Sequence, residues 1–310
     1  MNKIAIAIHG GAGPDSDYIK QHLKDYKKGL EEAINEAYQM LQEGSSSVDA
    51  VETAIKALED NPLFNAGKGS ALTEKAEVEM CSSIMNGFDL KCGAAAIVRN
   101  VRNPIRLARQ IMEKTKHIYL GSAGAAEFAK QINLPMEPDA YFITEHQFEQ
   151  YEKTRKKQND NGQQLAIEQL NKKHGTVGAV ALDIRGNVAA GTSTGGTDFC
   201  RSGRIADSSM IGAGTYANNE TCAVSTTGEG ELHMQYVSAF HVSALMEYKG
   251  LSLLEACRFL IHEKCKHING DMGLIAVDTK GNLVAEFNTP RMHRAMKSST
   301  QDLIVDVYPK

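Results

Sequence analysis

The hydrophobic pattern at the start of the chain predicts one buried strand followed by two helices. Residues 4–8 (IAIAI) are apolar and end abruptly in HGGAGP, so we predict a buried strand that enters a tight glycine loop. The segment DYIKQHLKDYKKGLEEAINEAYQMLQEG has helical periodicity and ends at Gly44, and a second helix follows the serines at 45–47. The apolar stripes comprise Leu23, Tyr26, Leu30, Ala33, Ile34, Ala37 and Leu41 in the first helix, and Val48, Val51, Ile55 and Leu58 in the second.

Later segments have the period of strands, interrupted by helices. TVGAVALDI and VAAGTST flank a turn at 185–187, and GLIAVD and LVAEF flank TKGN, so each pair predicts a hairpin. ELHMQYVSAFHVSALMEY predicts one helix between the hairpins, and LSLLEACRFLIHEKC predicts another after it. Earlier in the chain, CGAAAIVRN predicts a buried strand and NPIRLARQIMEK a helix with proline near its start. This order favours an α+β fold over repeated βαβ units.

The segment from about residue 146 to residue 175 differs from its surroundings. HQFEQYEKTRKKQNDNGQQLAIEQLNKKH is dense in Gln, Lys, Asn and Glu and has little to bury, so we predict a mobile surface linker. The linker runs without a turn through Gly175 into Thr176 and then directly into an apolar strand.

Composition narrows the classes of function. The 310 residues are 42% hydrophobic and 23% charged, and the net charge of −4 gives no basic surface for nucleic acid or an anionic membrane. We therefore expect a small molecule or another subunit as the partner. Few apolar residues precede His9, and there is no apolar run of about 18 residues, so we expect a cytoplasmic protein. The six cysteines form no CxxC pair and are interpreted as reduced thiols.

Thr176 has two interpretations. The ordinary one is that a β-branched residue opens a strand and Gly175 is the hinge before it. The other is that the Gly175–Thr176 peptide bond is cut, which leaves Thr176 with a hydroxyl nucleophile and a free α-amine as its base. Such an amine titrates at about 7.7–8.0, close to working pH.

Candidate companions for Thr176 lie at later strand ends. Thr194 lies in the run TSTGG, and Thr227 with Gly228 lies in STTGEG, where a hydroxyl and a backbone N–H could face a developing oxyanion. Both runs are also typical of ordinary tight turns. Arg204 and Asp207 could form a surface ion pair, or hold the carboxylate and ammonium of an α-amino acid in a pocket.

Eight motifs follow one another along nearly the whole chain: HGGAG (9–13), LEDNPLFNAGKGS (58–70), HGTVGAVALD (174–183), GTSTGG (191–196), GRIADS (203–208), GAGTYANN (212–219), STTGEGE (225–231) and FNT (287–289). Together they resemble the plant-type L-asparaginase/isoaspartyl aminopeptidase family of N-terminal nucleophile hydrolases. The resemblance implies an αββα sandwich, formed as one domain from an α chain (1–175) and a β chain (176–310) after self-cleavage. It also implies a dimer of such αβ units and no catalytic cofactor.

The resemblance implies a role for each site residue. Thr176 would be the nucleophile and Thr194 the hydroxyl that orients it, while Thr227 and Gly228 would bind the oxyanion. The implied substrate anchors are Arg204, Asp207 and Gly230, and the implied supporting residues are Asn65, His9, Gly10 and Gly11. The implied sodium loop, whose backbone carbonyls would bind a structural Na⁺, comprises Leu58, Glu59, Asn61, Phe64, Ala66 and Lys68.

The implied activity is hydrolysis of L-asparagine and of β-aspartyl dipeptides. The alternatives are a glycosylasparaginase, disfavoured by the absence of an export signal, and a non-processing relative that only binds a small molecule. Two segments depart from the family pattern, residues 197–202 at the pocket border and Cys81–Ser82. HGGAGP does not match GxGxxG, and His262, Cys265 and His267 do not share one helix face, so dinucleotide and metal sites are not favoured.

Overall fold

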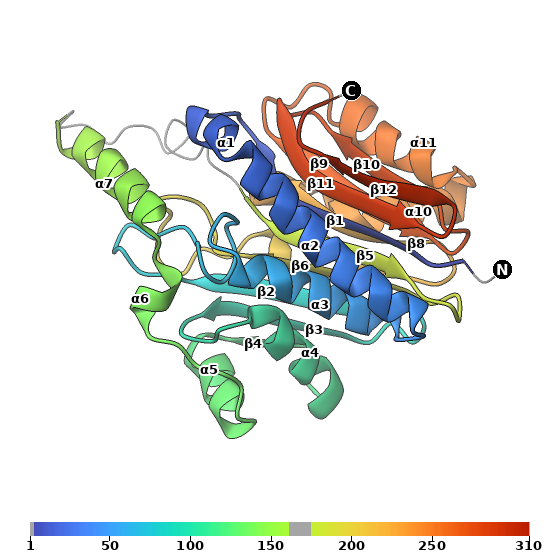
Figure 1. Ribbon diagram of the computed structural model, residues 1–310, viewed down its shortest axis with the longest axis horizontal. Coiled ribbons are helices and arrows are strands. Elements are labelled where there is room, and N and C mark those ends of the chain that lie inside the picture. Colours follow the sequence, from blue (N-terminus) through green and yellow to red (C-terminus); the bar gives the residue numbers. More distant parts are fainter. Residues whose placement is uncertain (1–2, 161–174, 310) are drawn as a thin grey trace.

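A large antiparallel sheet occupies the centre of the molecule in the computed structural model, which describes residues 3–160 and 175–309 (Figure 1). Within these residues the sheet has eight strands in the order β12-β11-β1-β5-β6-β2-β3-β4, and only the β3–β4 pair is parallel. The strands are β1 (Ala5–Gly13), β2 (Met80–Asn86), β3 (Cys92–Val98), β4 (Tyr119–Gly121), β5 (Val177–Leu182), β6 (Val188–Thr194), β11 (Arg291–Ser298) and β12 (Gln301–Asp306).

A smaller antiparallel sheet packs against one face of the large sheet. In the described part of the chain it has four strands in the order β10-β9-β8-β7. These strands are β7 (Thr215–Ala217), β8 (Cys222–Gly228), β9 (Met272–Asp278) and β10 (Leu283–Phe287).

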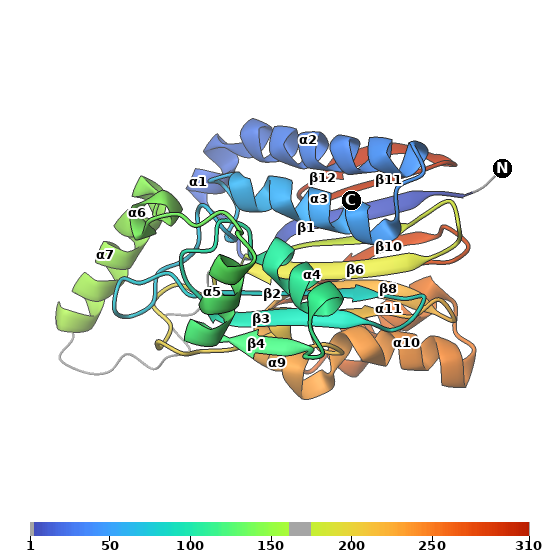
Figure 2. The same ribbon diagram turned by 90° about the horizontal axis from the view of Figure 1, so that it is seen from below.

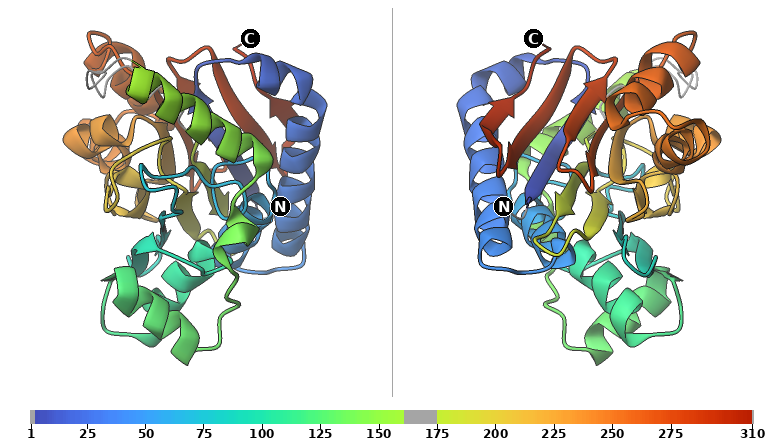
Figure 3. Two further views of the ribbon diagram at one scale, coloured as in Figure 1. Left: turned by 90° about the vertical axis from the view of Figure 1, so that its left-hand side faces the viewer. Right: turned by 90° about the vertical axis from the view of Figure 1, so that its right-hand side faces the viewer.

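Helices cover the two outer faces, as Figures 2 and 3 show. Helices α2, α3 and α4 lie on the large sheet, and α10 and α11 lie on the small one. The helices of the first half are α1 (Asp17–Gln21), α2 (Leu23–Gln42), α3 (Ser47–Asp60), α4 (Pro104–Lys114), α5 (Ser122–Gln131), α6 (Asp139–Phe142) and α7 (Glu145–Asp160). Those of the second half are α9 (Gly230–Tyr236), α10 (Ser238–Lys249) and α11 (Leu253–Arg258), with a 3₁₀ turn at Asp207–Ser209 and a π turn at Phe259–Lys264.

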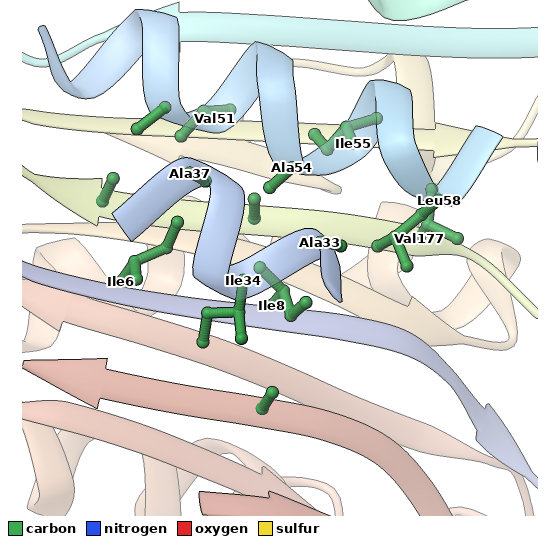
Figure 4. Close-up of a cluster of buried hydrophobic side chains, with 14 of the residues drawn as sticks. Ile6, Ile8, Ala33, Ile34, Ala37, Val51, Ala54, Ile55, Leu58 and Val177 are labelled. Atoms are coloured by element: carbon green, nitrogen blue, oxygen red, sulfur yellow. The ribbon is translucent and has the colours of Figure 1, made fainter. Parts of the chain in front are cut away.

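Strand β1 shows how the sequence builds these layers. Ile6 and Ile8 face α2 and α3, where they pack in one cluster with Ile34 (Figure 4). Ala5 and Ala7 point to the other face and pack against the small sheet. Because both faces are buried, residues 5–8 of the strand are all apolar instead of alternating with polar residues, and the small alanines let the two sheets approach each other.

Several predicted elements are confirmed. The two hairpins are β5–β6 and β9–β10, and CGAAAIV forms β3. Pro104 is at the first turn of α4, where its missing N–H costs nothing. The serine cap of α3 is Ser46, which forms a capping box with Asp49.

Two predicted helices are interrupted, and the predicted glycine loop is part of a strand. HGGAG continues β1 because it pairs with β11 through a bulge. The first helix breaks at His22 into α1 and α2. The helix predicted over 231–248 breaks at Val237, since the first N–H groups of α10, from Ala239 and Phe240, donate to carbonyls of the loop at 212–213.

The first half of the predicted linker is a helix, which corrects that prediction. Gln147 of α7 donates to the carbonyl of Gly69 at 2.8 Å, and Tyr151 stacks on Phe199 with ring centroids 5.4 Å apart. A few such contacts and ion pairs along the helix, such as Lys153–Glu149, hold a segment that has no apolar stripe. Residues 161–174, the other part of the predicted linker, lie outside the described residues.

All six cysteines are free thiols, as predicted, and four of them are buried. No helix in the described ranges has the length and apolar character needed to cross a membrane.

The break at Val237 predicts a stabilising substitution. Val237 adopts φ 47°, a left-handed conformation that costs a residue with a Cβ about 1–2 kcal/mol, and its side chain is 45% exposed, so little burial would be lost. We expect Val237→Gly to raise the free energy of unfolding by about 1 kcal/mol, measured by urea denaturation. Val237→Ala keeps the Cβ, so its free energy of unfolding should rise less than that of the glycine variant. A glycine variant less stable than the alanine variant would contradict the prediction.

Candidate functional site

Thr176 lies just before β5, in the middle of the large sheet, and Thr194 is the last residue of the neighbouring strand β6. The Thr176 hydroxyl donates to Oγ1 of Thr194 at 3.4 Å, and the Thr194 hydroxyl donates to the carbonyl oxygen of Gly175 at 3.3 Å. The backbone N–H of Gly196 donates to Thr194 Oγ1 at 3.1 Å. The Thr194 hydroxyl therefore donates its single proton to the carbonyl of Gly175, and its two lone pairs accept from the Thr176 hydroxyl and the Gly196 N–H.

Asn65 holds the turn that follows Thr194. Its side-chain amide donates to the carbonyl of Gly196 at 2.7 Å, and its side-chain oxygen accepts from the N–H of Ala71 at 2.7 Å. Its own carbonyl accepts from the N–H of Gly195 at 3.0 Å. Asn65 thus ties the loop after α3 to the end of β6.

His9 fixes the other side of Thr176. Its Nδ1 lies 2.8 Å from the carbonyl oxygen of Thr176, and its Nε2 lies 3.0 Å from Oγ of Ser225. Burial lowers the pKa of His9 from 6.5 to about 3, so the ring is neutral at working pH. Since a carbonyl can only accept, Nδ1 carries the proton and Nε2 accepts from Ser225.

A row of buried hydroxyls continues from His9 between the two sheets. Ser225 Oγ lies 2.7 Å from Thr192 Oγ1, which accepts from Thr215 at 2.6 Å, and Thr215 accepts from Ser83 at 2.8 Å. Thr192, Thr215 and Ser225 lie within the motifs GTSTGG, GAGTYANN and STTGEGE, whereas Ser83 lies outside every motif, and none of the four was predicted as a site residue. Their connection becomes apparent only once the strands are paired.

Gly11 brings the β1 backbone against the Gly175–Thr176 bond. Its φ is +108°, and a Cβ built on it would lie 2.9 Å from the Cα of Gly175 and 3.4 Å from the N atom of Thr176. A side chain at Gly11 would therefore meet the backbone at the candidate cleavage point. Gly10, its neighbour, packs against Phe64.

Thr227 and Gly228 occupy different positions relative to Thr176. Gly228 lines the same pocket as Thr176, whereas the Thr227 hydroxyl accepts from the N–H of Ala12 at 3.1 Å. The Thr227 carbonyl lies 2.9 Å from Nε2 of the buried His233. Thr227 therefore links β8 to the HGGAG segment, and its hydroxyl proton is not used in that bond.

Arg204 and Asp207 both line the pocket, but each has another partner. Arg204 donates to both carboxylate oxygens of Glu231 at 2.7 Å, which raises its pKa despite the opposing effect of burial. Asp207 is buried and accepts from the Thr226 hydroxyl at 2.7 Å. No ion pair joins Arg204 to Asp207 in the described chain, so they are not the simple surface pair that their spacing allowed.

The pocket is small with Gly175 in place. It is lined by Gly175, Thr176, Thr194, Gly196, Thr197, Arg204, Ala206, Asp207, Ser208, Gly228 and Gly230. Its free volume is about 10 Å³, roughly enough for one water molecule. A Cβ on Gly230 would lie 2.5 Å from Oδ1 of Asp207, so this glycine keeps the backbone close to the carboxylate. The single chain therefore assembles the polar groups but leaves no room among them for an amino acid.

The last turn of α3 supports the site through Glu59. This fully buried side chain accepts from the Ser193 hydroxyl at 2.6 Å and from the N–H of Ile105 at 3.0 Å. Burial raises the Glu59 pKa from 4.5 to about 8. Because Ser193 precedes Thr194, Glu59 fixes the end of β6 from the helical side.

The loop that follows α3 has a cradle lined by carbonyl oxygens. A Cβ on Gly69, whose φ is +105°, would lie 2.5 Å from the carbonyl oxygen of Pro62 and 2.7 Å from that of Phe64. The carbonyls of Ala66 and Lys68 accept no hydrogen bond from described residues, while four others each accept one backbone N–H. Those four belong to Leu58, Glu59, Asn61 and Phe64. Oxygen ligands of this kind suit a hard cation. The chemistry of the loop is therefore compatible with the Na⁺ that the family resemblance implies.

Comparisons with known proteins assign the chain to a family. It belongs to the asparaginase family, whose model matches residues 2–305. It is 42% identical over 302 residues to the isoaspartyl peptidase of Escherichia coli (strain K12), and the matched region covers 95% of this chain and 93% of the relative. It is 40% identical over 331 residues to the probable isoaspartyl peptidase/L-asparaginase 2 of Arabidopsis thaliana, with 99% of each covered. The isoaspartyl peptidase/L-asparaginase of Homo sapiens is 42% identical over 296 residues, with 94% and 92% covered.

The neutral His9 predicts a pH dependence of stability. Its pKa is about 3 in the folded protein against 6.5 ordinarily, so as pH falls from 6.5 to 3 the unfolded chain takes up a proton that the folded protein does not. Between pH 6.5 and 3, His9 should therefore lower the free energy of unfolding by up to about 1.4 kcal/mol for each pH unit. The variant His9→Gln can still donate to Thr176 and accept from Ser225. Its free energy of unfolding, measured by urea denaturation, should fall less steeply between pH 6.5 and 4 than that of the wild type.

His233 and His293 are also buried with lowered pKa values, so the slope should shrink in the His9→Gln variant but not vanish. An identical slope in wild type and His9→Gln would contradict the prediction.

Proposed function

We propose that this protein is an amidohydrolase that converts L-asparagine to L-aspartate and ammonia and hydrolyses β-aspartyl dipeptides, with Thr176 as the nucleophile. The observation that carries the proposal is the pair Thr176 and Thr194, joined to the carbonyl of Gly175 by consecutive hydrogen bonds. The relatives support the reaction, because their names combine isoaspartyl peptidase and L-asparaginase. The chain is accordingly a hydrolase of the asparaginase family.

Maturation begins with attack of Thr176 Oγ1 on the carbonyl carbon of Gly175. The hydroxyl proton passes to the departing backbone nitrogen, and the peptide becomes an ester between Gly175 and the Thr176 side chain. Water then hydrolyses this ester, which leaves a carboxylate on Gly175 and a free amine on Thr176. The Thr194 hydroxyl, which donates to the Gly175 carbonyl at 3.3 Å, stabilises the negative charge that develops on that oxygen.

The mature enzyme reuses the same hydroxyl on its substrate. The free Thr176 amine takes the hydroxyl proton, and Oγ1 attacks the side-chain carbonyl of asparagine or of a β-aspartyl residue. The proton goes to the leaving ammonia or amino acid, and water then hydrolyses the β-aspartyl ester. The N–H of Gly228 and the remaining proton of Thr227 would stabilise the oxyanion.

Arg204, Asp207 and Gly230 would hold the α-carboxylate and α-ammonium of the substrate. Arg204 pairs with Glu231, whose side chain is 55% exposed, so a substrate carboxylate can take the place of Glu231 while the latter returns to water. Asp207 is buried beside the Gly230 backbone, where it can accept from an ammonium group. His9, Gly10, Gly11 and Asn65 support the site by positioning Thr176 and the turn after Thr194.

The same proposal covers the chain's organisation. The helices on both outer faces and the two stacked sheets support an αββα sandwich of the N-terminal nucleophile hydrolase type, which an α chain of residues 1–175 and a β chain of 176–310 would form together. Two such αβ units would associate as a dimer. The carbonyl-lined cradle between Leu58 and Lys68 would hold a structural Na⁺, which neutralises the carbonyl dipoles and takes no part in the reaction.

Removal of the Thr176 hydroxyl should abolish both cleavage and hydrolysis. Intact mass under denaturing conditions should show chains of 175 and 310 − 175 = 135 residues for wild type and one chain of 310 residues for Thr176→Ala. Thr194→Val should slow cleavage by roughly a hundredfold or more, because it removes the donor to the Gly175 carbonyl. Thr221→Ala, which changes a buried threonine bonded to Ser243 away from the pocket, is the matched control and should cleave normally.

Substrate assays on the cleaved protein separate the alternatives. Turnover of asparagine and β-aspartyl dipeptides above that of N-acetylglucosaminyl-asparagine is expected, and the reverse order would favour a glycosylasparaginase. A wild-type chain that stays uncut and hydrolyses nothing would refute the enzyme and leave a binding protein.

The sodium loop predicts a cation-specific stability. Because a ligand that binds only the folded state stabilises it, thermal unfolding in sodium chloride should have a higher midpoint than in choline chloride at equal ionic strength. The midpoint should rise with added Na⁺ and then level off. Equal midpoints at all ratios of the two salts would contradict a sodium site.

A further inference from the structure

Gly175 also lines a second cavity, distinct from the pocket that contains Arg204. Its volume is about 100 Å³, larger than the pocket itself. Gly175 lines both spaces, and Gly10 and Asn65 also line this second one. In the proposed mature enzyme, cleavage frees Gly175 from Thr176, so the two spaces would be continuous past the nucleophile.

Arg291, on β11, lines this cavity and forms no ion pair with a carboxylate of the described residues. It is 6% exposed, and its Nε donates to the carbonyl of Pro14 at 3.0 Å. Within the described residues, no Asp or Glu lies within ion-pair distance of its guanidinium. A guanidinium in this position has the charge and the planar donors that bind a carboxylate, and burial without such a partner is costly.

Burial lowers the pKa of Arg291, and the nearby carboxylates, Asp15 among them, oppose this effect only in part. Asp15 pairs with Lys20 at 3.6 Å and accepts from the N–H of Ser16 at 2.9 Å. His293 lies 3.1 Å from Arg291 through its Nδ1, and burial beside this cation keeps the His293 pKa well below its usual value, so the ring is uncharged.

The guanidinium is also close to the reacting bond. Nη1 of Arg291 donates to the carbonyl oxygen of Gly11 at 3.3 Å, and Gly11 is the residue whose backbone packs against Gly175 and Thr176. In a β-aspartyl dipeptide, the terminal carboxylate carbon lies only about 4 Å from the carbonyl carbon that Thr176 attacks, because three bonds separate them. The leaving residue must therefore place its carboxylate near the nucleophile, on the side away from Arg204.

We propose that this cavity receives the leaving residue of a β-aspartyl dipeptide and that Arg291 binds its terminal carboxylate. The inference rests on the proposed function. Arg291 would then be a specificity-determining residue that asparagine does not use, since ammonia as a leaving group carries no carboxylate. Pro62 and Leu63 at the same cavity give the leaving side chain an apolar surface.

The test compares β-aspartyl-alanine with its C-terminal amide, which differs only in the charge that Arg291 would bind. Wild type should have a kcat/KM roughly tenfold or more higher for the acid than for the amide, because a hydrogen bond to a charged group discriminates by at least that factor. Arg291→Met should bring the ratio close to one, and Arg291→Lys should restore part of it.

Arg294→Met is the matched control. Arg294 is an equally buried arginine on β11 that donates to the carbonyls of Met292 and Tyr308 and does not line the cavity, so this variant should keep the wild-type ratio. An acid-to-amide ratio near one in wild type would overturn the proposal without any variant, even if Arg291→Met does not fold. An equal loss for acid, amide and asparagine in Arg291→Met would also overturn it, since Arg291 would then only position Gly11. Failure of the proposed function is distinct, because wild type would then hydrolyse none of the three.

Discussion

The structure around Thr176 depends on one buried, uncharged hydrogen-bond donor, the Nδ1–H of His9. It holds the Thr176 carbonyl from β1, while its Nε2 accepts from Ser225 on the second sheet. Desolvation keeps the ring neutral, which fixes the tautomer and lets one side chain act as donor to one sheet and acceptor from the other. The start of β5 is thereby fixed between two sheets, and no charged side chain is needed beside the proposed nucleophile.

The proposed substrate anchors are held differently, by partners that a ligand could replace. Arg204 is held by the exposed end of Glu231, and Asp207 by a neutral hydroxyl of Thr226. In the uncut chain these groups are already in position, but Gly175 leaves room for only about one water molecule. In the proposed enzyme, self-cleavage would therefore open a site whose polar groups are preorganised, and little reorganisation would accompany substrate binding.

Much of the fold followed from local pattern, and the errors have local causes. The hairpins, α3 and α4 were predicted because their periodicity, turns and caps agree with one another. The helix over 231–248 was predicted as continuous because its apolar pattern has no visible break at Val237; hydrogen bonds from Ala239 and Phe240 to a distant loop caused the break. The polar segment α7 was predicted as a linker because its few anchors, such as Tyr151 against Phe199, are formed by residues distant in sequence.

By itself the sequence determined the family, the order of elements and the residue types of the candidate site, because motifs and periodicity are local properties of the chain. Only the tertiary structure decided which of those residues meet. In the structure, Thr176 is hydrogen-bonded to Thr194. Arg204 pairs with Glu231 rather than with Asp207, and the Thr227 hydroxyl accepts from the N–H of Ala12. The fold also placed Arg291 beside Gly11, with no ion pair to a carboxylate of the described residues. Hydrogen bonding, burial and pKa depend on neighbours that the fold brings together from 18 to 280 residues away, and no local pattern encodes them.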